Sequence, residues 1–113
     1  MAEQQKRDEI PPGTLYMLIL RTLARGGEMH GYEIANAIQR LSEEVLQVEE
    51  GSLYPALQRM LLKGWVEAEW GVTSGNRRAR YYQLTKLGRQ QLEAELAQYR
   101  RVNGAIEKIL QTA

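Results

Sequence analysis

The side chains with the clearest binding chemistry lie together in residues 52–63. Tyr54 and Gln58 are four residues apart, and Arg59 follows, so a helix would carry all three on its polar side. A glutamine amide matches the edge of adenine, and an arginine guanidinium matches the edge of guanine, each through two hydrogen bonds. Gln58 and Arg59 are therefore candidates for contact with nucleic acid bases, and which of the two reaches a base edge stays open.

A second candidate stretch follows about twenty residues later and carries Arg77, Arg78 and Arg80. Guanidinium groups bind phosphate oxygens in pairs of hydrogen bonds, so this cluster predicts sequence-independent phosphate contacts or the insertion of one side chain into a narrow minor groove. The alternative is a run of charge that only adds solubility. The charge along the chain agrees with this prediction. Residues 1–50 hold 5 basic and 9 acidic groups, a balance of −4, and residues 51–113 hold 10 and 5, a balance of +5. The basic half favours a polyanion as partner, although two solvated faces of opposite sign would give the same counts.

Enzyme chemistry finds little support in the sequence. The chain has one histidine and no cysteine, and it shows neither a glycine-rich phosphate loop nor a pair of spaced carboxylates. His30 has no second histidine or nearby aspartate, so it is interpreted as a capping or packing residue rather than a metal ligand or general base. We therefore expect no catalytic residues, no metal and no cofactor.

Three helices are predicted in the first two thirds of the chain, over residues 14–26, 31–41 and 52–63, because apolar residues recur there at helical spacing. Ser52 is the expected N-cap of the third helix, and Pro55 is tolerable in a first turn, where backbone N–H groups have no intrahelical partner. Gly64 is expected to end that helix.

A hairpin is predicted next, because the hydrophobic period changes to two. Val66, Ala68 and Trp70 alternate with polar residues, residues 73–76 have turn chemistry, and residues 79–84 form the return strand. The three arginines then lie at the tip and on the return strand. Trp65 and Trp70 are predicted to anchor the core and the hairpin.

The last predicted helix begins at the capping residue Thr85, runs to about Gln111, and is too long for the preceding elements to cover. One stripe on it steps by 4, 3, 4, 3 and 4 residues, a heptad register with an asparagine inside it. We predict that this stripe forms a homodimer, the alternative being a clasp folded onto its own domain. The stripe consists of Leu92, Leu96, Tyr99, Asn103, Ile106 and Leu110.

The chain has 113 residues, of which 43% are hydrophobic and 26% are charged. This length and composition are typical of one compact domain with short extensions. The polar residues 1–12 end in Pro11-Pro12 and are expected to form a disordered tail. The longest apolar run is far shorter than the roughly 20 residues of a membrane span, and the N-terminus lacks the apolar core of a secretory signal. These features predict a cytoplasmic location and no membrane partner.

Three helices followed by a hairpin with a basic tip is the element order of a winged helix-turn-helix. Within this element order, the sequence itself resembles that of the PadR-like family of bacterial transcriptional regulators. The resemblance rests on HGYEIANAI in residues 30–38, on EGSLYPALQRMLLKGWV in residues 50–66 and on ARYYQLTKLG in residues 79–88. It implies a mainly α fold with a small β-hairpin, in which residues 13–85 form the winged helix-turn-helix domain and residues 86–113 form a C-terminal dimerisation helix.

The resemblance also implies a function, that of a dimeric repressor bound to an inverted-repeat operator in double-stranded DNA. It assigns Ser52, Tyr54, Pro55 and Gln58 to the DNA-facing side of the third helix. Arg59 and Lys63 join them by helical spacing, with a solvated surface role as the alternative. Tyr54 either binds backbone phosphate or packs against the second helix.

Two further expectations concern partners. The family resemblance implies a small lipophilic or aromatic effector, for which Met17, Tyr99 and Asn103 are the candidate lining, although plain interface packing is the preferred interpretation of these three residues. The alternative function is a winged-helix docking module that assembles with proteins and never binds DNA. Docking would not require three arginines at a hairpin, and phosphate binding would.

Overall fold

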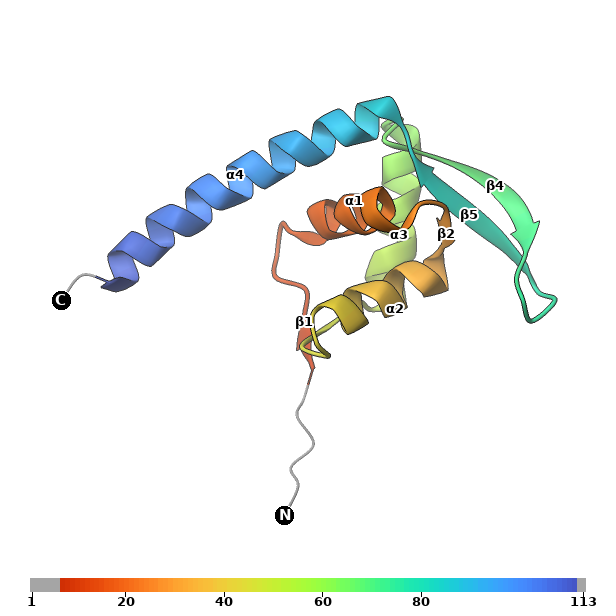
Figure 1. Ribbon diagram of the computed structural model, residues 1–113, viewed down its shortest axis with the longest axis horizontal. Coiled ribbons are helices and arrows are strands. Elements are labelled where there is room, and N and C mark those ends of the chain that lie inside the picture. Colours follow the sequence, from red (N-terminus) through yellow and green to blue (C-terminus); the bar gives the residue numbers. More distant parts are fainter. Residues whose placement is uncertain (1–6, 112–113) are drawn as a thin grey trace, which may run out of the picture.

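A computed structural model describes residues 7–111, in which four helices and a small sheet follow one another along the chain (Figure 1). Helices α1 (Leu15–Gly26), α2 (Gly31–Leu41) and α3 (Glu50–Leu62) come first. The hairpin of β4 (Val66–Val72) and β5 (Arg78–Leu84) follows, and α4 (Lys86–Gln111) ends the described part. This is the predicted mainly α fold with a β-hairpin.

Three strands of two residues each were not predicted: β1 (Asp8–Glu9), β2 (Met29–His30) and β3 (Leu46–Gln47). Strand β2 pairs with β5 in antiparallel fashion, which gives a three-stranded sheet of order β2-β5-β4. Strand β1 pairs with β3 in parallel. Such short pairs depend on distant backbone partners and leave no periodic pattern in the sequence.

The ends of the elements follow local chemistry. Gly64 follows α3 with a φ of 76°, a left-handed conformation that glycine adopts without strain, as predicted. His30 caps α2 because its Nδ1 accepts the N–H of Glu33, whose carboxylate accepts the N–H of His30. His30 is thus a capping residue, as expected. Thr85 accepts the N–H of Gly88 and so caps α4.

The core lies where α1, α2 and α3 meet the sheet. Ile19, Leu20, Ile34 and Leu57 are all completely buried, and Tyr82 of β5 joins them with 5% exposure. Alternation along β5 places Tyr82 on the same face as the buried Leu84 and Tyr81 on the other face. This core fixes the orientation of α3 and of the hairpin relative to each other.

The tail predicted over residues 1–12 is corrected in part. Residues 1–6 lie outside the described residues. Asp8–Glu9 is a strand, the side chain of Arg7 approaches Glu44 to 3.4 Å, and Ile10 packs against the core. The segment joins the domain because backbone pairing and one apolar side chain suffice to hold it, although its polar composition suggests a tail.

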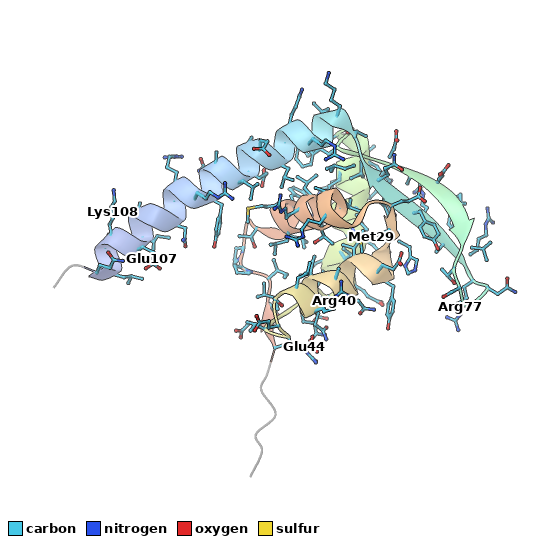
Figure 2. All side chains as sticks on the ribbon, viewed as in Figure 1. Met29, Arg40, Glu44, Arg77, Glu107 and Lys108 are labelled. Carbon is cyan, nitrogen blue, oxygen red and sulfur yellow. The ribbon has the colours of Figure 1, made fainter. Side chains whose placement is uncertain are left out.

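Helix α4 crosses over α1 and then continues beyond the rest of the domain (Figure 1). Its 26 residues correspond to about 39 Å at 1.5 Å per residue. Residues 97–111 are all exposed, and Glu107 and Lys108 lie at the far end (Figure 2). Within residues 7–111 no helix combines the length and apolarity that crossing a membrane needs.

Candidate nucleic-acid interface

Helix α3 presents one apolar face to the core and one polar face to solvent. Leu53, Ala56, Leu57 and Met60 are at most 1% exposed. The predicted DNA-facing residues all lie on the exposed side: Ser52, Tyr54, Pro55, Gln58, Arg59 and Lys63. The division into two faces is the one that the apolar spacing predicts.

The beginning of α3 differs from the prediction. The N-cap is Glu49 rather than Ser52, since the N–H groups of Ser52 and Leu53 both donate to the carbonyl of Glu49, at 3.0 and 2.9 Å. Pro55 therefore lies inside the helix rather than in its first turn. Proline lacks the N–H that would bind the carbonyl of Gly51, but Gly51 is exposed, so water can satisfy that carbonyl. The longer helix is also favoured by Glu50, an acidic residue in its first turn.

This earlier start changes the electrostatics of the helix end. Free N–H groups at the start of a helix can bind backbone phosphate. Glu49 and Glu50 now occupy the N-cap and the first position, and both are exposed. Two carboxylates repel a phosphate at the site where the helix dipole would attract it. Phosphate contacts are therefore better assigned to the side of α3 and to the hairpin.

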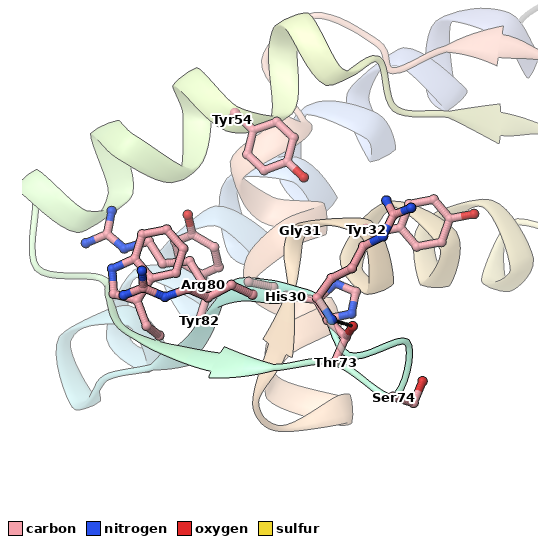
Figure 3. A pocket seen from close by; sticks show the side chains of 12 residues that line it. His30, Gly31, Tyr32, Tyr54, Thr73, Ser74, Arg80 and Tyr82 are labelled. Carbon is pink, nitrogen blue, oxygen red and sulfur yellow. Dashed lines mark hydrogen bonds between the residues drawn. The ribbon is translucent and has the colours of Figure 1, made fainter.

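Tyr54 rests on the first residue of α2. A Cβ atom built on Gly31 would come within 2.7 to 2.9 Å of three atoms of the Tyr54 ring, its hydroxyl oxygen included. The tyrosine nevertheless remains 46% exposed. Packing against α2, one of the two alternatives from the sequence, is thus present (Figure 3), and the exposed part of the ring leaves the other alternative, contact with backbone phosphate, open.

On the opposite flank of α3, Arg59 is held by a residue that the sequence did not single out. The Nε–H of Arg59 donates to the hydroxyl of Tyr16 on α1, and its guanidinium lies 5.7 Å from the centre of the Tyr16 ring. The Tyr16 ring in turn meets Trp65 edge to face, at 5.4 Å. Lys63 lies 5.3 Å from the Trp65 ring. Because Tyr16 is 43 residues from Arg59, no local pattern could reveal this contact.

The hairpin separates positive from negative charge between its two faces. Trp70 lies opposite Arg80 in the β4–β5 register, and the guanidinium groups of Arg78 and Arg80 lie 4.7 and 5.9 Å from its ring centre. Glu67 and Glu69 alternate with these positions and therefore point to the other face. Arg77 lies at the tip (Figure 2). The face that carries the arginines is the one shared with Tyr82.

The basic face of the hairpin, α2 and α3 together enclose an open concavity of about 850 Å³. Its lining includes Tyr32 and Tyr54 from the helices and Trp70, Arg78 and Arg80 from the hairpin (Figure 3). The Nε of Arg80 is buried there and has no hydrogen-bond partner among the described residues. The concavity thus combines aromatic walls with positive charge.

Two observations bear on proton and metal chemistry. Burial raises the pKa of the Tyr82 phenol above 10.0, an effect larger than the opposing one of the nearby Arg80 charge, so the phenol stays neutral at physiological pH. Within residues 7–111 no group of three or more metal-binding side chains comes together.

The predicted dimerisation stripe divides into two parts. Leu92 is 4% exposed and belongs to the core of its own chain, and Leu96 packs against that core. The prediction that Leu92 lies between two copies is therefore wrong, because the first turns of α4 lie over their own domain. Apolar residues that face the same chain's core recur at the same spacing as those of a heptad interface. Tyr99, Asn103, Ile106 and Leu110 remain exposed.

The predicted effector-binding residues differ in how far they are exposed. Met17 is 7% exposed, whereas Tyr99 is 45% exposed and Asn103 lies on the exposed part of α4. The 850 Å³ concavity lies elsewhere and contains none of the three.

Comparison with known proteins identifies the family. The model of the transcriptional regulator PadR-like family matches residues 19–94, which are 76 of the 113 residues. The chain belongs to the PadR-like family of transcriptional regulators. Members of this family are regulators rather than enzymes, which confirms the expectation from the sequence. A protein of Lysinibacillus sphaericus with no described function is 30% identical over 105 residues, which are 93% of this chain and 95% of that protein.

Solved structures of PadR-like regulators share the fold. A transcriptional regulator from Clostridium thermocellum superposes with a TM-score of 0.79 at 25% identity, covering 88% of this chain and 95% of that one. A PadR-like regulator from Bacillus cereus gives 0.74 at 29% identity, covering 89% and 95%. Bacillus subtilis PadR, solved in complex with operator DNA, gives 0.64 at 25% identity and covers 74% of this chain and 47% of that one. The winged helix-turn-helix fold is thus common to these proteins.

Proposed function

We propose that this PadR-like regulator is a homodimeric repressor that binds a specific operator in double-stranded DNA. The observation that carries the proposal is the charge distribution on the hairpin. Arg78 and Arg80 lie on the face turned toward α3, and Glu67 and Glu69 lie on the opposite face. A phosphate backbone needs this separation, and a hairpin that only provides solubility does not. The DNA complex of Bacillus subtilis PadR supports the same partner.

Each side chain has a proposed role. Gln58 and Arg59 contact base edges in the major groove, since an amide and a guanidinium can each discriminate between bases. The Nε of Arg59 is already bound to Tyr16, which leaves the two terminal nitrogens to face guanine. Ser52, Tyr54, Pro55 and Lys63 contact the backbone or pack beside it, and Arg77, Arg78 and Arg80 neutralise phosphates.

Dimerisation is assigned to the distal part of α4. Tyr99, Ile106 and Leu110 are 45%, 48% and 71% exposed on a helix that continues past its own domain, and Asn103 keeps the same register. A second copy of this helix is the partner that matches a heptad spacing. The two recognition helices of a symmetric dimer favour an inverted repeat, with half-sites about one helical turn or roughly 34 Å apart.

The effector response remains a prediction from the family resemblance. Tyr99 and Asn103 lie on the proposed dimer helix, so a pocket that includes them and Met17 needs the second copy to complete it. A cytoplasmic location is proposed because the operator is there in a bacterial cell.

The proposal is tested by the salt dependence of binding to duplex DNA, measured by fluorescence anisotropy. The double variant Arg77→Ala/Arg78→Ala removes two phosphate contacts per protomer, so the slope of log K against log salt should fall by roughly 1.8 per protomer. The matched control is Arg21→Ala/Arg25→Ala, which removes two exposed charges from α1 on the side away from Tyr16. An unchanged slope in the hairpin variant would remove the wing from the mechanism. No duplex binding by the unaltered protein would favour the docking module instead.

A further inference from the structure

Trp70 is a large aromatic residue that lies outside the hydrophobic core and is mostly exposed to solvent. It is 59% exposed in the middle of β4, whereas Trp65, at the start of the same hairpin, is half-buried against Tyr16. A large exposed aromatic side chain within a charged surface is a feature of binding sites rather than of solvated strands.

The neighbours of Trp70 are two cations. Arg80 is its direct partner across the strands, and Arg78 is the diagonal neighbour on the same face. Their guanidinium carbons lie 5.9 and 4.7 Å from the indole centre, both within the range of a cation–π interaction. Neither arginine has a carboxylate within 4.0 Å among the described residues. Strand alternation places both arginines on this face, and the indole is the group that both guanidinium groups approach.

Stacking orients a guanidinium without using its hydrogen-bond donors. An arginine that lies against an aromatic face keeps its N–H edge available for a phosphate. Two arginines held on the same ring present their donors to one short stretch of backbone, and they lose less conformational freedom on binding than two free side chains. The concavity that Arg78, Arg80 and Trp70 line also opens toward Tyr54 of α3.

We propose that Trp70 is a positioning residue of the DNA interface: its indole holds Arg78 and Arg80 toward one sugar–phosphate segment, and its exposed face packs on that segment. The occupant is the backbone of one DNA strand, because the site pairs positive charge with an aromatic surface and excludes the acidic side chains Glu67 and Glu69. The inference rests on the proposed function and adds a residue and a location to it.

The test is a double-mutant cycle between Trp70 and the two arginines, read by anisotropy with a specific and a scrambled duplex. Trp70→Leu keeps an apolar side chain but removes the π system. It should weaken binding to both duplexes by roughly five- to tenfold, given the modest strength of exposed cation–π contacts in each of two protomers. Trp70→Phe keeps a weaker ring and should lose less. In an Arg78→Ala/Arg80→Ala background, Trp70→Leu should weaken binding clearly less than in the unaltered protein, because the part of its effect that acts through the arginines is already lost and only the packing of the ring on the backbone remains.

A spectroscopic measurement separates this role from a structural one. In a Trp65→Phe background Trp70 is the only tryptophan, and acrylamide should quench its fluorescence freely in the absence of DNA and at least twofold less in the complex. The reciprocal Trp70→Phe protein reports Trp65 and should show little change. Thermal unfolding of Trp70→Leu should remain close to that of the unaltered protein, since the side chain is 59% exposed.

The outcomes distinguish the two claims. If the unaltered protein binds neither duplex, the proposed function fails, and the inference fails with it. If it binds, but Trp70→Leu costs the same with and without the arginines and Trp70 stays equally quenchable in the complex, only the inference is overturned.

Discussion

Replacing Gly31 with alanine should damage DNA binding while leaving the domain stable. The added Cβ would come within 2.7 Å of the Tyr54 ring and 2.8 Å of its hydroxyl oxygen, whereas carbon atoms in contact prefer about 3.5 to 4.0 Å. The ring of Tyr54 must therefore move by about 1 Å. It has room to move, because Tyr54 is 46% exposed and the clash involves only the far end of its side chain.

The substitution should leave the free energy of unfolding intact but lower the affinity for DNA. Alanine is favoured over glycine in helices by up to about 1 kcal/mol, and Gly31 begins α2 without a positive φ, so the free energy of unfolding should stay equal or rise slightly. A displaced Tyr54 would lose its proposed contact with the DNA backbone, a hydrogen bond worth about 1 kcal/mol per protomer at this partly exposed site. Two protomers on one operator then lose about 2 kcal/mol, or roughly 30-fold in Kd.

The assay compares Gly31→Ala, Tyr54→Ala and the double variant by anisotropy on one operator duplex, with thermal unfolding of each protein. If the effect of Gly31→Ala acts through the tyrosine ring, it should almost vanish in the Tyr54→Ala background. The reasoning is refuted if Gly31→Ala binds as tightly as the unaltered protein, or if it weakens binding equally with and without the tyrosine.

Three other perturbations follow from the same contacts. Tyr16→Phe removes the oxygen that accepts the Nε–H of Arg59, so it should weaken operator binding about two- to fivefold and hardly affect binding to a scrambled duplex. Equal losses of affinity for both duplexes in paired titrations would contradict a role of Arg59 in base reading. Gly88→Ala places a Cβ 2.0 Å from the main-chain carbonyl oxygen of Trp65 and should destabilise the fold by about 2 to 3 kcal/mol. The control Gly104→Ala has nothing within 4 Å of the new Cβ and should not lower the melting temperature. Equal melting curves for the two variants would contradict the packing of α4 on the domain. Deleting the chain from Tyr99 onward should give folded monomers in sedimentation equilibrium, because residues 97–111 are exposed in the single chain, and a persisting dimer would contradict the role of α4.

The helices and the hairpin could be predicted because their periodicity and end signals are local. The stripe of α3, the turn at residues 73–76 and the helix stop at Gly64 all depend on neighbours in sequence, and the structure confirms each. The predicted start of α3 was wrong because Ser52 is a favoured N-cap residue type, whereas the helix begins three residues earlier at Glu49, whose side chain makes no capping hydrogen bond. The extra turn is decided by backbone hydrogen bonds to Glu49 that no residue type announces.

Contacts between distant residues lay beyond the sequence. The pairing of Asp8–Glu9 with Leu46–Gln47 and the hydrogen bond from Arg59 to Tyr16 both join segments more than thirty residues apart. Leu92 shows a different limit, since one heptad spacing describes equally well a helix packed on its own domain and a helix packed on a second copy. The sequence predicted the exposed residues of α3 and the hairpin arginines, but not the contacts of Arg59 with Tyr16 and of Tyr54 with Gly31, and it treated Trp70 only as an anchor of the hairpin.

The most direct test of the central claim is anisotropy of the unaltered protein on two labelled duplexes, the DNA upstream of its own gene and a scrambled version, across roughly 50 to 200 mM salt. A sequence-specific regulator should bind the upstream duplex at least about a thousandfold more tightly than the scrambled one, and both affinities should fall steeply with salt. Equal affinity for both duplexes, or binding insensitive to salt, would contradict specific recognition through α3 and the basic face of the hairpin.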